Sequence, residues 1–162
     1  MSTLETLETL LTLVTLISVP VGVFYYVVTL RNQRRNREAA LLMQIHSQWT
    51  TLIHKSYSEI MRWEWDDYDD YREKYGDLAS QERLETVGGY FEGIGVYVRE
   101  GLIPIRLVTL FMTSPIVRFH EKFGPIAKEE RVRHNAPRIG SETEYLYNEL
   151  MRYVEAHPEL KT

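Results

Sequence analysis

Histidine and carboxylate side chains give this chain its widest choice of chemistry, because both can bind metals and transfer protons. The sequence contains 5 histidines and 23 aspartates and glutamates. A di-iron bundle needs Glu-x-x-His on two helices, but the residues three positions before the histidines are Met43, Thr51, Val117, Arg131 and Val154. A zinc-protease helix needs His-Glu-x-x-His, and no second histidine follows His120-Glu121 at that spacing. We therefore predict no metal and no cofactor.

Nucleophilic catalysis has no recognisable motif here. Cysteine is absent, which excludes thiol nucleophiles and disulfides. The chain has no Gly-x-Ser-x-Gly turn for a serine hydrolase. Its glycine-rich stretch at 88–95 lacks both the Lys-Ser/Thr of a phosphate loop and the preceding strand of a dinucleotide motif. We predict no catalytic residue, and an enzyme is the less favoured class.

The glycines themselves are more informative than any catalytic motif. Four of them stand inside a predicted helix, at Gly88, Gly89, Gly93 and Gly95. Each costs about 0.8–1 kcal/mol relative to alanine, so a close contact should offset that cost. Gly89 and Gly93 share a face, which indicates tight packing against another helix. The alternatives are the floor of a small-ligand pocket and a subunit interface.

Three residues near these glycines are the candidate ligand-binding side chains of such a pocket: Glu92, Arg99 and His120. His120 stands between two phenylalanines on an inward-facing stripe, so it could equally be a core histidine with one hydrogen bond. If a pocket exists, we expect these three side chains to line it.

A cluster of aromatic and acidic residues at 63–71 could bind a protein partner. Exposed tryptophan and tyrosine carry much of the binding energy of interfaces, so the candidate partner-binding residues are Trp63, Trp65, Tyr68 and Tyr71. The competing interpretation is that these rings cover the core while the aspartates face water. Both interpretations stay open.

These side chains must be positioned by helices, and the first predicted helix is unusually apolar. Residues 9–30 contain no charge, and Arg31, Arg34, Arg35 and Arg37 follow at once. Twenty-two helical residues span about 33 Å, enough for the ~30 Å hydrocarbon core of a bilayer. A cleaved signal peptide is less favoured, because Glu5 and Glu8 replace a basic start and no small-residue cleavage site precedes the arginines.

The predicted layout has four segments. Residues 1–8 are a short extracytoplasmic N-terminus, 9–30 a transmembrane helix, 31–37 a basic juxtamembrane segment and 38–162 a cytosolic helical domain. The arginine excess places the C-terminal side in the cytoplasm. We thus expect a single-pass protein of the cell membrane, with its arginine flank against anionic headgroups of the lipid bilayer.

Charge differs sharply between the two parts. Residues 1–37 carry a net charge of +2, from four arginines and two glutamates, whereas the remainder carries −6. An acidic domain lacks the basic surface that nucleic-acid binding requires. We therefore exclude nucleic acid as a partner.

The cytosolic part is predicted to be all-α, a compact bundle of about five helices, because no alternating strand pattern occurs. The first helix should run without a breaker from 31 to 63, with an apolar face that includes Leu52. A connection at 63–79 follows, and Ser80 should cap a helix to about Gly101. The 3-4 spacing of apolar residues in that helix predicts a core stripe of Leu84, Val87, Phe91, Ile94 and Val98.

The C-terminal half is predicted to contain three or four further helices. Pro104 should open a short one, Ser114-Pro115 should start another, and Gly124-Pro125 should kink or end it. A charged segment follows at 126–135. A capping box of Ser141 and Glu144 should begin the last helix.

Two stretches carry a resemblance to a known family. They are the segment Gly88 to Ile103, with an aromatic-Glu pair at Phe91-Glu92 and a Gly-Leu-Ile corner at 101–103, and the segment Tyr145 to Val154. With the single N-terminal span, they resemble an uncharacterised prokaryotic family of single-span membrane proteins with a helical cytosolic domain of unknown function. The resemblance covers about residues 38–157. A Trp-Glu-Lys-like segment of that family has His120 in place of tryptophan. The resemblance implies the fold and no site residues.

Two functional hypotheses arise from the sequence. The first is a membrane-tethered module or accessory subunit that binds another protein or itself, because catalytic motifs are absent and the aromatic cluster and glycine face are present. The second is a small-ligand sensor or an enzyme with a pocket at the Gly88–Gly95 face.

Overall fold

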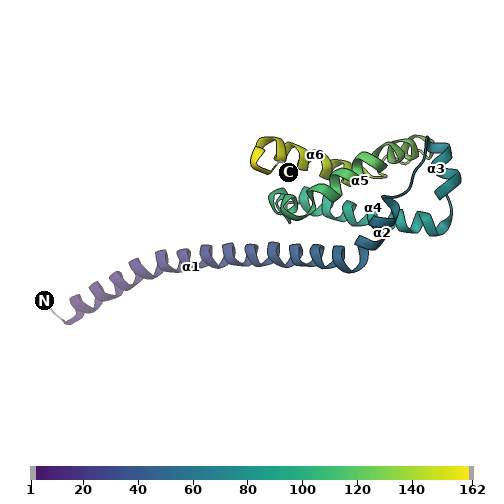
Figure 1. Ribbon diagram of the computed structural model, residues 1–162. Helices are drawn as coiled ribbons and strands as arrows, with labels where there is room; N and C mark the ends of the chain where they lie inside the picture. Colours follow the sequence, from purple (N-terminus) through teal and green to yellow (C-terminus); the bar gives the residue numbers. More distant parts are fainter. Residues whose placement is uncertain (1–2, 161–162) are drawn as a thin grey trace. The chain divides into compact units, whose positions relative to one another are not determined.

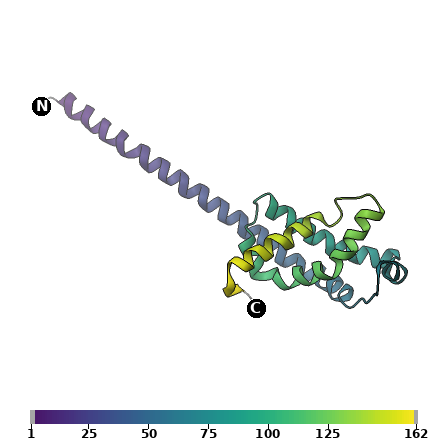
Figure 2. The same ribbon diagram turned by 90° about the horizontal axis from the view of Figure 1, so that it is seen from above.

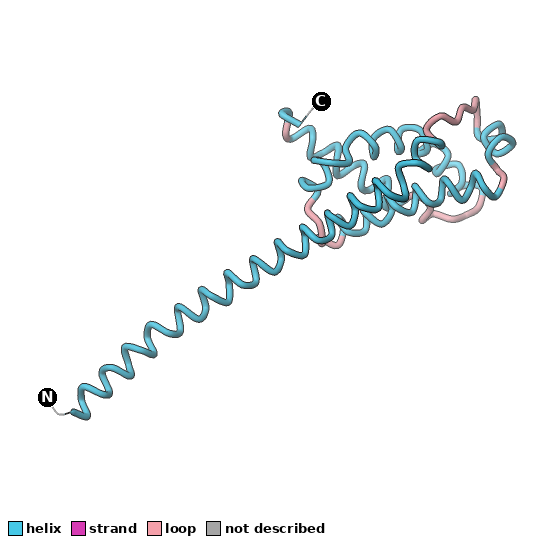
Figure 3. The backbone as a smooth tube through the Cα atoms, turned by 60° about the horizontal axis from the view of Figure 1, so that its bottom comes forward, coloured by secondary structure: helices cyan, strands magenta, loops and turns pink. Residues whose placement is uncertain are grey.

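The structure is a computed structural model, and it describes residues 3–160. Over this range the chain forms helices and loops and no strand (Figure 3). The predicted all-α class is confirmed. Residues 1–2 and 161–162, at the ends of the predicted 1–8 and 38–162 segments, lie outside the described residues. The chain divides into two units, Met1–Ala40 and Leu41–Thr162.

The first unit consists of the N-terminal part of helix α1, which spans Thr3–Gln48. Its apolar side chains from Leu7 to Leu30 are exposed. Three hydroxyls on this stretch donate hydrogen bonds to carbonyls one turn earlier: Thr12 to Glu8, Thr15 to Leu11 and Ser18 to Val14. These donors therefore need no water. By length and composition, this is the one helix among residues 3–160 that could cross a membrane.

Helix α1 continues into the second unit, where it ends in an irregular turn. One π-helical stretch at Trp49–Ile53 links it to α2, His54–Ile60. A π-turn holds an extra residue, so it rotates the apolar face of the helix after it. As a result Ile53 and Tyr57 are buried, and Leu52, which the sequence placed on the inner face, is 66% exposed. That prediction was wrong by one position.

The remaining helices are α3 (Tyr68–Tyr75), α4 (Leu78–Arg99), α5 (Ile105–Arg133) and α6 (Ser141–Ala156), with a final 3-10 turn at Pro158–Leu160. A short corner turns the chain back between α4 and α5, so these two helices run antiparallel (Figure 1). Helix α6 packs against both α4 and α5 (Figure 2). The predicted bundle of about five helices is confirmed.

The N-caps of α4 and α6 differ from the caps that the sequence predicted. Asp77, not Ser80, caps α4: its carboxylate accepts the Ser80 backbone N–H at 3.1 Å. Hydrogen bonds from the Ser80 hydroxyl and from its backbone N–H hold the pKa of Asp77 below its usual value. At α6, the predicted capping box is absent, because Gly140 takes the N-cap position with a φ of +66° and no side-chain cap bond forms there.

Helix α5 differs most from the helices that the sequence predicted. The sequence predicted a helix start at Ser114-Pro115 and a kink or end at Gly124-Pro125, yet one helix passes through both prolines. Each proline leaves one carbonyl four residues earlier without its N–H partner. Those carbonyls belong to Phe111 and Glu121, both exposed, so water can satisfy them. A continuous buried stripe outweighs the two lost bonds; it comprises Val108, Met112, Ile116, Phe119, Phe123 and Ile126.

The core lies where this stripe meets α2, α4 and α6. Phe91 of α4 is fully buried against Phe119, with ring centroids 5.0 Å apart. Lys122 ties the end of α2 to α5, because its ammonium donates to the carbonyl of Met61 at 3.0 Å and to that of Trp63. Its pKa is lowered by desolvation. The α4 stripe centred on Val87, Phe91 and Ile94 is buried as predicted.

Candidate functional site

A cavity of about 450 Å³ lies in the helical domain between α3, α4, α5 and the first turn of α6. Its lining is mainly apolar and includes Leu84, Phe119, Phe123, Ile126, Ala127 and Ile139. Its charged groups are Arg72, Glu85, Glu92, Glu130, Arg131 and Glu144. This size, with an apolar floor and a few polar groups, is typical of small-molecule sites. We call it the α4–α6 pocket.

Two glycines of α4 keep this pocket open. A Cβ atom built on Gly89 would meet nothing within 4 Å, and one on Gly88 would meet only Phe119 Cζ at 3.9 Å. Both residues line the cavity. Side chains at these positions would therefore project into or beside empty space, and close helix packing does not explain the glycines.

The expected close packing occurs at another glycine. A Cβ at Gly95 would collide with the backbone carbonyl oxygen of Glu142 on α6, whereas one at Gly93 would meet nothing within 4 Å. The prediction of a backbone approach at Gly89 and Gly93 was therefore wrong in position. Gly95 carries the helix–helix contact, while Gly88 and Gly89 border the pocket.

His120 lines the pocket from α5. Its imidazole stacks on the Tyr147 ring, with centroids 4.2 Å apart, and the absence of a side chain at Gly124 leaves room for it. Neither ring nitrogen has a hydrogen-bond partner among residues 3–160. Burial lowers the pKa of His120, although Glu144 opposes that change. The ring is therefore neutral near pH 7 and can offer the pocket one donor and one acceptor.

Glu92 also lines the pocket, and it has a structural task. One carboxylate oxygen accepts the backbone N–H of Thr143 at 2.8 Å. Thr143 is the third residue of α6, so Glu92 caps that helix from α4. The cap that the sequence assigned to Ser141 thus comes from a residue about fifty positions earlier.

Arg99, the third candidate, lies outside the pocket lining. Its guanidinium pairs with Glu142 at 2.7 Å and lies over the Tyr145 ring, 4.0 Å from the centroid. These contacts join the end of α4 to the first turns of α6. The structure therefore brings Glu92 and His120 together in one cavity and places Arg99 elsewhere.

Arg131 and Glu144 form the α6 side of the pocket. Arg131 donates to a Glu144 carboxylate oxygen at 2.6 Å and to the carbonyl of Ile139 at 2.6 Å. The hydrogen bond from Arg131 lowers the pKa of Glu144. These two hydrogen bonds hold the Arg131 guanidinium in the wall of the pocket.

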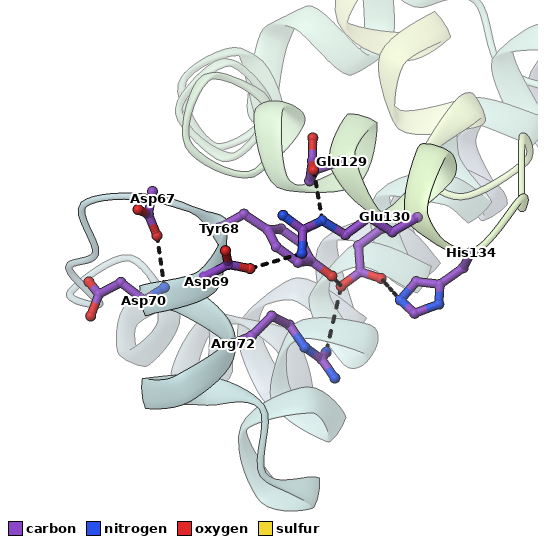
Figure 4. A network of polar contacts seen from close by, with 9 residues as sticks. Asp67, Tyr68, Asp69, Asp70, Arg72, Glu129, Glu130 and His134 are labelled. Carbon is purple, nitrogen blue, oxygen red and sulfur yellow. Dashed lines mark hydrogen bonds and ion pairs between the residues drawn. The ribbon is translucent and has the colours of Figure 1, made fainter.

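A polar network closes the α3 side, and Glu130 is its centre (Figure 4). Glu130 accepts the Tyr68 hydroxyl at 2.8 Å, and it lies 3.5 Å from Arg72 and 3.0 Å from His134. Burial and the neighbouring Glu130 raise the pKa of Tyr68. Arg133 extends the network to Asp69 at 2.8 Å. These contacts fasten α3 to the end of α5.

The four aromatic candidates for partner binding pack onto the core. Tyr71 is fully buried, and Trp63, Trp65 and Tyr68 are half-buried against core residues. Trp63 stacks on Tyr75 with ring centroids 4.3 Å apart. The aspartates between them are mostly exposed. This is the core-covering arrangement that the sequence left open.

The arginines that flank the apolar segment lie on the helix surface. The four flanking arginines, Arg31, Arg34, Arg35 and Arg37, are exposed on α1, and Arg34 pairs with Glu38 at 3.0 Å. Within the part of the chain that the structure describes, no group of three histidine, cysteine, aspartate or glutamate side chains could hold a metal ion.

Sequence reasoning missed Glu85, Arg72, Arg131 and Glu144 as pocket residues. For Glu85 a signal was present: it precedes Glu92 by seven residues, so both lie on one helix face. Arg131 and Glu144 belong to different helices, and only the fold brings them together.

A comparison with protein families decides the chain's affiliation. The model of a domain of unknown function, DUF4760, matches residues 3–150. The chain belongs to the DUF4760 family. The resemblance to an uncharacterised family thus holds at this level, and the DUF4760 match also includes the apolar part of α1. No curated protein and no solved structure matches this DUF4760 chain.

Proposed function

We propose that this protein is a membrane-anchored binding domain that holds a small molecule in the α4–α6 pocket. The observation that carries the proposal is the open space above Gly88 and Gly89. Two glycines in one helix cost about 2 kcal/mol relative to alanine, and no neighbouring atom requires them. A ligand that approaches the α4 backbone accounts for both.

The membrane part of the proposal rests on α1. Its segment 9–30 is mostly apolar and exposed, and the hydroxyls of Thr12, Thr15 and Ser18 donate to carbonyls within the helix. Such internal partners lower the cost of placing a polar group in a bilayer. We propose a single span with the helical domain on the cytoplasmic side, where the four arginines meet anionic headgroups.

The pocket offers binding chemistry rather than a complete catalytic set. His120 lines it with a lowered pKa and unpartnered ring nitrogens, but it makes no hydrogen bond with Thr143 or Tyr71, whose hydroxyls are the potential nucleophiles of the lining. A sensor or receptor domain therefore fits better than an enzyme.

The test is a thermal-stability screen of the full-length protein in lipid nanodiscs against a metabolite library. Fluorescence of Trp49, Trp63 and Trp65, all in the helical domain, reports unfolding. The informative variants are Gly89→Leu, which fills the cavity, and Gly93→Leu on the same helix, which does not line it. A ligand of the pocket raises the midpoint of the wild type and Gly93→Leu but not of Gly89→Leu. A screen without such a compound contradicts the proposal.

A second candidate function is protein–protein interaction. Leu110 and Phe111 are adjacent on α5 and more than half exposed. Phe111 contacts His46, one turn from the exposed Met43. Such a patch could bind a partner protein or a second copy. Crosslinking in native membranes tests it: a specific product should disappear in Phe111→Ser and persist in Val132→Ser, an exposed apolar position near the other end of α5.

A further inference from the structure

The charges around the α4–α6 pocket do not cancel. Four carboxylates and two guanidinium groups line it, which leaves a formal charge of −2. Arg131 neutralises Glu144, and Arg72, Tyr68 and His134 surround Glu130. The remaining two carboxylates belong to Glu85 and Glu92.

These two glutamates flank the glycine gap. Glu85 and Glu92 are seven residues apart on α4, so they lie on one face, separated by about two turns or 10 Å along the axis. Gly88 and Gly89 stand between them. The helix therefore presents a carboxylate at each end of a strip that has no side chain.

Their partners leave both carboxylates able to receive a cation. Glu92 accepts one backbone N–H, from Thr143, and no cationic side chain among residues 3–160 lies within ion-pair distance of it. Glu85 is exposed and has no hydrogen-bond or ion-pair partner among residues 3–160. Neither charge is balanced by the protein itself, apart from the partial positive charge at the start of α6 that reaches Glu92.

The aromatic residues that line the pocket also suit an organic cation. Phe119, Phe123 and Tyr71 line the cavity and are buried. Aromatic faces attract ammonium groups, more strongly where water is excluded. The neutral His120 ring adds no opposing charge.

An anionic ligand finds much less in this pocket. Arg131 directs Nε at the Ile139 carbonyl and Nη1 at Glu144, so a carboxylate already faces its guanidinium, and the Thr143 N–H of the α6 terminus is taken by Glu92. Arg72 is the one lining guanidinium held loosely, 3.5 Å from Glu130. An anion there would also face Glu130.

We propose that the α4–α6 pocket binds a small organic cation, an amine or diamine on an apolar chain, with its ammonium groups at Glu85 and Glu92 and its carbon chain over Gly88 and Gly89. This inference deepens the proposed function and rests on it.

The experiment compares three probes of equal chain length: 1,8-diaminooctane, 1,8-octanediol and octanedioate. Calorimetric titrations use the full-length protein in zwitterionic nanodiscs, with empty nanodiscs as the blank. Because each charged contact is worth about tenfold in affinity or more, the diamine should bind at least about tenfold more tightly than the diol. Octanedioate should not bind measurably.

Variants separate the pocket from general surface charge. Glu85→Gln, which breaks no internal contact, should weaken diamine binding about tenfold, a typical effect of losing one charged partner. Glu92→Gln keeps an oxygen for Thr143 and should do the same. Gly89→Leu should abolish binding, and Gly93→Leu should leave it unchanged.

The inference is overturned if the diamine fails to bind, if the diol or octanedioate binds as well, or if Gly89→Leu leaves diamine binding intact. The proposed function has a separate outcome. A library compound of another charge class that depends on Gly89 would preserve the pocket and reject the cation, whereas the absence of any such compound would reject both.

Discussion

At the residue scale, Gly95 and Gly93 of α4 form a natural pair, because one is packed and the other is free. Gly95→Ala forces a methyl group into the Glu142 carbonyl on α6, and we expect it to lower the free energy of unfolding by about 1–3 kcal/mol. Gly93→Ala should raise it by about 1 kcal/mol, the helix-propensity gain. Urea unfolding followed by tryptophan fluorescence measures both. Equal effects of the two substitutions would contradict the assigned packing.

His120 gives the domain a pH dependence with a definite sign. Burial lowers its pKa below the unfolded value of about 6.5, so the unfolded chain binds the proton more readily. The stability that neutral His120 contributes is therefore fully present above about pH 6.5, and it is lost as the pH falls through the lowered pKa. The charges that act on the ring are Glu144 on α6 and Glu121, Lys128 and Arg131 on α5.

His120→Gln should remove this dependence. The wild-type thermal midpoint should fall as the pH drops below about 6.5, and the midpoint of the variant should stay flatter over the same range. The Arg131–Glu144 pair loses its contribution only at more acid pH, as Glu144 is protonated through its lowered pKa. An identical decline in both proteins would show that His120 is not the responsible group.

At the element scale, the start of α6 depends on a side chain from α4. Glu92→Ala leaves the Thr143 N–H without its acceptor and should destabilise the protein by about 1 kcal/mol, the usual worth of a helix cap. Glu92→Gln keeps an acceptor oxygen and should cost much less. Thermal unfolding of the two variants measures the difference. Ser141→Ala should leave the thermal stability nearly unchanged. A loss of stability as large as that of Glu92→Ala would instead support the predicted cap by Ser141.

Helices were predictable from the sequence to the extent that local patterns agreed with the core. The stripe through Val87, Phe91 and Ile94 was visible because α4 is regular. The single α5 was not, because Pro115 and Pro125 are strong local stop signals. Only the buried stripe that runs through both prolines outweighs them, and its value depends on α4 and α6 being in place.

The site was predictable only in part, for a similar reason. Glycines in a helix interior pointed to α4, and the phenylalanines beside His120 pointed to its burial. Arg99 was misplaced because it shares the α4 sequence neighbourhood but faces Glu142 and Tyr145 on α6. Pairings such as Arg131 with Glu144 join different helices, and no spacing along the chain encodes them.

At the scale of the whole molecule, the proposed function needs both units. The helical domain carries net negative charge and the first unit carries the arginines, so anionic lipid should attract one and repel the other. A pocket for organic cations on an anchored domain would report ligand at the membrane surface. That arrangement requires a single span with a defined orientation.

The absence of cysteine makes the orientation directly measurable. Ser2→Cys places one thiol before the apolar segment, and Ser114→Cys places one at an exposed position of α5. In intact cells a membrane-impermeant maleimide should label Ser2→Cys, and it should label Ser114→Cys only after lysis, because the proposed topology puts the side with the four arginines in the cytoplasm. Both proteins should stay in the membrane pellet after alkaline carbonate. Labelling in the opposite order would reverse the proposed topology, and release by carbonate would remove the membrane span itself.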